Sequence, residues 1–154
     1  MLPLWNDDCI VRFLVYKSCA EVYRTGHKSS GVYKVDPDGL GETDVFCDQN
    51  TAGGGWTVFQ KRQDGSVDFY RGWDDYKRGF VHLNGEFWLG LDNIHRLTKS
   101  GNNKLRVDLE LHQEKAFAEY SFFAVDNETD KYKLSLSGYS GNHFTQYTWL
   151  LLSA

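Results

Sequence analysis

The chain has 154 residues, 41% of them hydrophobic and 25% charged, which is enough for one domain with its own core and excludes a disordered chain. Its net charge of −4 excludes the basic surface that non-specific nucleic-acid binding requires, so we expect no nucleic-acid partner. No apolar run approaches the ~18 residues of a membrane-spanning helix, so we expect no membrane span.

Residues 1–17 carry the weakest signals in the chain. Their apolar run is interrupted by Arg12, follows the acidic pair Asp7 and Asp8, and lacks a small-residue cleavage site, so it is a poor signal peptide. We leave this segment unassigned. A strand, a remnant of an upstream domain and translated non-coding sequence all stay open.

A short helix is predicted between Ser18 and Gly26. Ser18 is a good N-cap residue, and Glu21 follows three residues later, as in a capping box. Gly26 is typical of the position just after a helix end.

Two strands are predicted at 31–35 and 44–48, and the second carries Cys47. The loop between them is acidic, which raises the hypothesis of a calcium site. The EF-hand spacing is broken, however, by Pro37 and by a missing third acid. We therefore predict a solvated hairpin loop for the acidic residues Asp36, Asp38, Glu42 and Asp44.

Three glycines at 53–55 lead directly into a β-branched and aromatic run at 56–60, which predicts a strand. A phosphate-binding loop is excluded because these glycines precede a strand, and Trp56 stands where such a loop needs lysine. The glycines instead indicate a tight entry into a packed strand, close to another segment. A turn at 63–66 is followed by an aromatic cluster of Phe69, Tyr70, Trp73, Tyr76 and Phe80.

A second helix is predicted at 91–98, with Gly101 as its stop. His95 lies on or near its packed face and is interpreted as a packing histidine held by a hydrogen bond, not as a catalytic residue. Helical spacing is seen for Leu91, Ile94, Leu97 and Thr98.

Three further strands are predicted at 104–111, 116–125 and 132–139. The second is aromatic on both faces and is therefore expected to be central. Short loops at 112–115 and 126–131 imply antiparallel neighbours. The inward residues are expected to be Leu105, Val107, Leu109 and Leu111 in the first strand and Tyr132, Leu134 and Leu136 in the third.

Few residues carry a signal for modification or metal binding. Asn127, with Thr129 two residues later, forms an N-glycosylation sequon in a predicted loop, which is a suitable place if the chain is secreted. The three cysteines, Cys9, Cys19 and Cys47, form neither a Cys-x-x-Cys motif nor a Cys/His cluster, so no metal site is expected.

The sequence of the central stretch resembles the fibrinogen-like domain, the C-terminal module of fibrinogen. The family includes ficolins, angiopoietins, tenascins and tachylectins. The matching pieces, which are rich in tryptophan and glycine, are residues 53–60, 64–69, 73–80 and 84–91. The similarity runs from about Ser18 to Gly141.

This resemblance implies an α+β fold, with a small N-terminal disulfide-stapled subdomain and a central antiparallel sheet with short helices, here an incomplete fibrinogen-like fold. Cys19 and Cys47 match the first disulfide of the family. Cys9 is then left over, either for an intermolecular bridge or in an ill-defined tail, and we favour the tail. The resulting division is an unassigned segment at 1–17, a partial fibrinogen-like domain at 18–141 and a non-matching tail at 142–154.

In the family, the chain continues beyond this point through a subdomain with the calcium loop, a second disulfide and the recognition pocket, and a final strand returns to the central sheet. We therefore expect this chain to be truncated before those features. The resemblance then implies no cofactor, no calcium site and no binding of acetylated sugars by this chain alone. The apolar residues 149–152 of the tail either cover an exposed sheet edge or extend away from it.

The favoured function is a secreted, extracellular recognition protein that is lectin-like or binds receptors or matrix proteins. Its partners in the full-length family are carbohydrates, receptors and matrix proteins. The alternative is a structural or assembly module of the extracellular matrix without its own ligand pocket, joined to other copies through Cys9. An enzyme is not expected, because neither Gly-x-Ser-x-Gly nor His-Glu-x-x-His occurs in the sequence.

Overall fold

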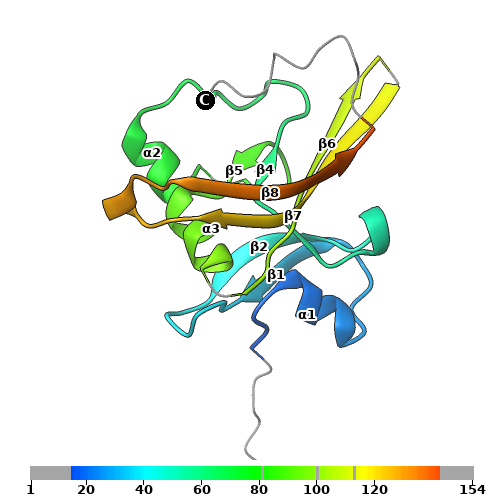
Figure 1. The fold of residues 1–154 in the computed structure, drawn as a ribbon, viewed down its shortest axis with the longest axis horizontal. Helices are drawn as coiled ribbons and strands as arrows, with labels where there is room; N and C mark the ends of the chain where they lie inside the picture. The colour runs from blue at the N-terminus through cyan, green and yellow to red at the C-terminus, as the bar shows by residue number, and fades with distance from the viewer. Residues whose placement is uncertain (1–14, 81, 100, 113, 143–154) are drawn as a thin grey trace, which may run out of the picture.

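The computed structural model describes residues 15–80, 82–99, 101–112 and 114–142. Within these ranges the fold is α+β, with three antiparallel sheets in the strand orders β1-β2-β3, β4-β5 and β6-β7-β8. The β1–β2 hairpin and helix α1 lie at one end of the molecule, and the β6–β8 sheet crosses its centre (Figure 1). Cys9 and residues 143–154 lie outside the described residues, so the predictions about them stay predictions.

Helix α1 (Cys19–Arg24) begins and ends at the predicted residues. The Ser18 hydroxyl accepts a hydrogen bond from the backbone N–H of Glu21 at 3.3 Å. The Glu21 carboxylate in turn accepts the N–H of Lys17 at 2.6 Å, which satisfies a donor at the helix start. The chain leaves the helix through Gly26, whose φ of +102° suits glycine.

Strands β1 (Gly31–Val35) and β2 (Thr43–Asp48) form the predicted hairpin, and β3 (Trp56–Val58) pairs with the other edge of β2. The strand predicted at 56–60 is interrupted at Phe59, and the chain continues as β4 (Gln60–Lys61), which pairs with β5 (Phe87–Trp88). The Phe59 carbonyl accepts the N–H of Leu89 at 2.8 Å, and its ring stacks on Phe123. One predicted strand thus serves two sheets.

The glycines before β3 allow the close approach that the sequence predicted. A Cβ atom at Gly54 would lie 2.5 Å from the Gln49 carbonyl oxygen and 2.6 Å from the Tyr23 ring. A Cβ at Gly55 would lie 3.1 Å from the Cα of Ala20. Because both positions also have positive φ, only glycine lets helix α1 pack directly on this segment.

Helix α2 (Trp73–Arg78) was not predicted, because the sequence shows only an aromatic cluster there. Its six residues are too few to show a helical period, and packing fixes the helix from outside. The Trp88 indole N–H donates to the Tyr76 carbonyl at 2.8 Å, and the Tyr76 ring lies against Phe80. Tyr76 and Phe80 therefore form the contact with β5, whereas Tyr70 is exposed and Trp73 lies against Tyr132.

Helix α3 (Leu91–Thr98) has the predicted bounds. The ring of His95 bonds through Nδ1 to the Val125 carbonyl at 2.9 Å, which confirms a packing histidine. Ile94 lies in a core with Phe123, Val125 and Tyr132, so α3 covers one face of the central sheet. Among the described residues, no helix combines the length and apolar character that crossing a membrane would need.

The central sheet consists of β6 (Leu105–Leu111), β7 (Glu114–Val125) and β8 (Leu134–Gly141), with β7 in the middle as predicted. The third strand begins two residues later than expected, because Tyr132 adopts a φ of 51° and belongs to the preceding turn. Its side chain is nevertheless buried. Leu134 is 52% exposed, so its predicted inward position is wrong: it opposes Val125 at the end of the sheet, where little covers it.

The face of β6 that was predicted to point inward is also more exposed than the alternation of its residues suggested. Val107 is 36% exposed, whereas Leu105 is partly buried against the core below α3. The loop expected at 112–115 is shorter, since Glu114 and Lys115 already belong to β7. The β6–β7 hairpin therefore extends beyond the body of the domain (Figure 1).

Candidate functional site

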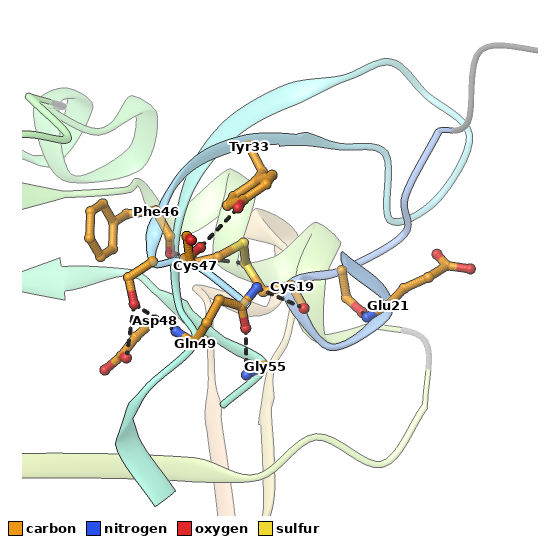
Figure 2. Close-up of a disulfide and its surroundings, with 11 residues drawn as sticks. Cys19, Glu21, Tyr33, Phe46, Cys47, Asp48, Gln49 and Gly55 are labelled. Carbon is orange, nitrogen blue, oxygen red and sulfur yellow. Dashed lines mark hydrogen bonds between the residues drawn. A yellow bond between two sulfur atoms is a disulfide. The ribbon is translucent and has the colours of Figure 1, made fainter. Parts of the chain in front are cut away.

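Cys19 and Cys47 form a disulfide with an S–S distance of 1.97 Å, as the resemblance implied. The bond joins the first residue of α1 to strand β2 (Figure 2). Both cysteines are fully buried, and Val35, Val45 and Leu89 complete their cluster. The disulfide is therefore at the centre of the N-terminal core, not at its surface.

Gln49 connects the disulfide region to the glycine-rich segment. Its buried side chain donates from Nε2 to the Cys19 carbonyl at 3.5 Å and accepts the Gly55 N–H at Oε1 at 2.8 Å (Figure 2). The Gln49 amide thus links the first residue of α1 to the residue that precedes β3, and both of its polar atoms have partners. The sequence analysis missed Gln49, because no pattern among neighbouring residues marks a buried glutamine whose hydrogen-bond partners are distant in the sequence.

Glu86 has a side chain that is 1% exposed and accepts hydrogen bonds from five different residues. Sequence analysis gave it no role, although it lies in the matching piece at 84–91. Arg62 pairs with its Oε2 at 2.9 Å. Its carboxylate also accepts backbone N–H groups from Gln63 at 2.5 Å, Asp64 at 2.9 Å, Gly65 at 3.0 Å and Val67 at 3.1 Å.

These donors change the acidity of Glu86. Hydrogen bonds from the backbone N–H groups of Gln63 and Gly65 favour the ionised carboxylate and lower the pKa of Glu86 to about 2, against the opposing effect of burial. The group is therefore an anion at neutral pH, and the chain from Arg62 to Val67 folds around it.

A shallow pocket of about 220 Å³ lies beside Glu86. The guanidinium of Arg71 lies 4.5 Å from the centre of the Phe80 ring, and its Nε donates to the Asp68 carbonyl at 2.7 Å. The pocket is lined by Val67, Arg71, Phe80, His82 and Glu86, so this part of the described structure brings neither serine nor cysteine beside its histidine. A nucleophile–base pair is not assembled at this pocket.

The acidic loop was predicted to be solvated, but two of its residues form ion pairs with Arg96 of α3 and with Lys99. Arg96 pairs with Asp38 at 2.7 Å and with Asp36 at 3.4 Å, and Lys99 pairs with Asp38 at 2.7 Å. The Asp38 side chain is only 3% exposed, so the prediction of a solvated loop is wrong for this residue. Hydrogen bonds from Arg96 and then Lys99 hold the pKa of Asp38 well below its usual range.

The ion pairs of this loop lead to a testable prediction about calcium. A calcium ion at Asp36 and Asp38 would have to displace two cationic side chains, and no group of three or more His, Cys, Asp or Glu residues in the described ranges is arranged to hold a metal. We expect isothermal titration of the purified chain with calcium chloride at micromolar concentrations to give only heats of dilution. Saturable binding that disappears in Asp38→Asn would contradict this prediction, and Glu42→Gln is the matched control.

The remaining predicted site residues that the structure describes, Asn127 and His95, do not form a common site with the disulfide. Asn127 lies in the turn between β7 and β8, whereas the disulfide joins α1 to β2. His95 is used in packing, and Cys9 lies outside the described residues. The site features that the structure shows are thus a buried disulfide, a carboxylate-centred loop and an ion-paired hairpin, which define a disulfide-containing α+β globe.

Comparison with known proteins identifies the family of this globe. The family model described as "Fibrinogen beta and gamma chains, C-terminal globular domain" matches residues 15–148, a wider span than the resemblance at 18–141. The chain belongs to this fibrinogen C-terminal domain family. It is 49% identical to mouse angiopoietin-related protein 7 over 80% of this chain and 38% of that protein. It is also 49% identical to human fibroleukin, over 85% of this chain and 30% of that protein.

Solved structures agree with the fold. The fibrinogen-like globe domain of human ANGPTL2 has a TM-score of 0.81 and 45% identity, and the match covers 87% of this chain and 63% of that chain. A lamprey fibrin D-dimer, complexed with the peptide ligand Gly-His-Arg-Pro-amide, has a TM-score of 0.77 and 38% identity, covering 87% of this chain and 44% of that chain. The chain therefore spans less than two fifths of the length of the two relatives above.

Proposed function

We propose that this chain acts outside the cell as a recognition protein that binds a carbohydrate, a receptor or a matrix protein without catalysing a reaction. The observation that carries the proposal is the fully buried Cys19–Cys47 disulfide in a fibrinogen-related domain. Disulfides of this kind form and persist in oxidising compartments, so secretion is the expected route. The similarity to angiopoietin-related and fibroleukin chains supports the same environment.

A binding role fits the chemistry of the described residues better than a catalytic one. The ionisable groups with the strongest perturbations are Asp38, Glu86 and Tyr132, and each has a structural partner. The Tyr132 hydroxyl donates to Asp92, and burial followed by this bond raises its pKa. Structural ion pairs and hydrogen bonds perturb a pKa as catalytic sites do, so these three shifts give no independent support for catalysis.

The test is export and binding of the full chain behind a secretory signal peptide. We expect soluble protein in the medium with Cys19 and Cys47 oxidised, and saturable binding to cultured epithelial cells or to decellularised matrix that reduction abolishes. EDTA should not compete, because no group of three or more His, Cys, Asp or Glu residues in the described ranges is arranged to hold a metal ion. Intracellular retention of a reduced chain, or oxidised soluble protein that binds neither probe, would contradict the proposal.

A second candidate is an assembly module, and sheet geometry favours it. Among the described strands, β6 and β8 each pair only with β7, which leaves both outer edges open to strand addition. Non-reducing electrophoresis of the secreted chain distinguishes this candidate. A disulfide-linked dimer that is lost in Cys9→Ala supports assembly, whereas a monomer at all concentrations opposes it.

A further inference from the structure

The turn between β7 and β8 presents a sequon on the surface. Asn127, Glu128 and Thr129 form the only Asn-x-Ser/Thr triplet in the sequence. Asn127 is exposed and precedes the 3-10 turn η2 (Glu128–Asp130). An acceptor for N-linked sugar must lie on the surface of the folded protein, and this position satisfies that requirement.

The two ends of the Asn127 amide have different environments. Its Oδ1 accepts the backbone N–H of Asp130 at 3.2 Å, which orients the side chain as a cap of the turn. Its Nδ2 has no hydrogen-bond partner among the described residues. By contrast, the Nδ2 atoms of three other asparagines are used in the fold: Asn50 donates to Ser30, Asn93 to the Leu89 carbonyl and Asn103 to the Thr98 carbonyl. The nitrogen that a sugar would occupy is therefore free of internal hydrogen bonds at Asn127, and Asn127 is the asparagine that also stands in a sequon.

The shape of the turn does not depend on that nitrogen. The Asn127 carbonyl accepts the N–H of Tyr132 at 2.9 Å, and Asp126 donates its N–H to the Lys133 carbonyl at 3.0 Å. The Glu128 carboxylate pairs with Lys77 of α2 at 2.5 Å, which ties the turn to the body of the domain. Substitution on Nδ2 therefore breaks no hydrogen bond of the folded chain.

We propose that Asn127 carries an N-linked oligosaccharide. The donor is a lipid-linked oligosaccharide pyrophosphate. Asn127 Nδ2 forms a bond to C1 of the first sugar and loses one proton, while the C1–O bond breaks and the lipid pyrophosphate leaves. Oδ1 keeps its bond to Asp130, so the turn is the same with and without the sugar. The inference rests on the proposed extracellular function, because only a chain that enters the secretory pathway meets this donor.

The experiment separates this inference from the function on which it rests. The full chain, fused to a heterologous signal peptide, is translated with microsomes, and only protease-protected chain is analysed. We expect a mobility shift that peptide-N-glycosidase F removes. When the release is done in heavy-oxygen water, mass spectrometry should find labelled aspartate at position 127. Translocated chain without sugar at Asn127 overturns the inference, whatever the fate of the exported protein.

Matched variants test the sequon itself. Thr129→Ala should abolish the shift while leaving the Asn127 cap intact, and Thr129→Ser should retain it. Thr129→Ala and glycosylated wild type should have similar denaturant midpoints, because the hydrogen bonds of the turn do not use Asn127 Nδ2. A shift that persists in Thr129→Ala would place the sugar elsewhere and would overturn the assignment. Failure of the correctly glycosylated chain to be exported would count against the extracellular function alone.

Discussion

Replacement of both Cys19 and Cys47 by alanine is expected to lower the free energy of unfolding by about 3.5 kcal/mol, since the bond closes a loop with a sequence separation of 28. The loss arises mainly because the cross-link restricts the unfolded chain. A small domain rarely has more than ~15 kcal/mol of total stability, so this is a large fraction. The surrounding core also loses packing, because both sulfur atoms lie among Val35, Val45 and Leu89.

The measurement is urea unfolding followed by tryptophan fluorescence, with and without reductant. Wild type in reductant should unfold close to the midpoint of the double variant, and reductant should leave the double variant unchanged. Cys9→Ala is the control, since it removes a thiol without touching this bond. An unchanged midpoint in the double variant would show that the disulfide does not stabilise the domain.

Elements with local signals were predicted well. Helix α1 has its cap, its glutamate and its terminal glycine within one short segment, and α3 shows its helical spacing directly. Strands β1, β2 and β7 were placed by β-branched and aromatic runs between turn residues. Such signals are readable because the residues that create them are neighbours in sequence.

Contacts between residues that are far apart in the sequence could not be predicted from local patterns. Asp38 is buried because Arg96, 58 residues later, reaches it from α3. Glu86 lies 19 residues or more beyond the N–H groups that it accepts. Helix α2 and the β4–β5 pair depend on Trp88 and Phe59, whose contacts also cross the sequence. The resemblance supplied the disulfide pairing, but composition and spacing alone did not.

The turn before β8 shows a different limit. Lys131 and Tyr132 both adopt positive φ, which non-glycine residues seldom do, so alternation predicted a strand that begins too early. Burial of the Tyr132 side chain and its hydrogen bond to Asp92 outweigh this local cost. Tertiary contacts therefore decide the register of this turn, and the sequon at Asn127 takes its position from it.

Glu86→Gln is expected to destabilise the domain strongly at neutral pH and to loosen residues 62–67. Glu86 Oε1 accepts three N–H groups, and Oε2 accepts one N–H and the Arg62 guanidinium. The amide of glutamine must place its own NH₂ against one of these donor sets. It also leaves the guanidinium without its anion. Hydrogen exchange should therefore accelerate at the amides of Gln63, Asp64, Gly65 and Val67.

The pH dependence gives the sharper readout. The pKa of Glu86 is about 2 in the folded chain. It is about 4.3 in an unfolded one. The unfolded state thus binds the proton more readily, and the stabilisation is fully present above the unfolded value. It is lost as the pH falls towards the folded value. Wild type and Glu86→Gln should therefore differ most in urea midpoint at neutral pH, and the difference should shrink steadily between about pH 4.3 and pH 2.

Glu42→Gln makes the same chemical change on an exposed residue, and its curve should follow wild type throughout. A constant gap between wild type and Glu86→Gln over this acid range would mean that the carboxylate charge is not what holds the loop. In that case the Glu86 side chain would stabilise the loop through its packing and not through its charge. A shrinking gap, with faster exchange confined to residues 62–67, would instead show that one buried anion organises the loop beside the pocket, because Glu86 accepts all four of those N–H groups.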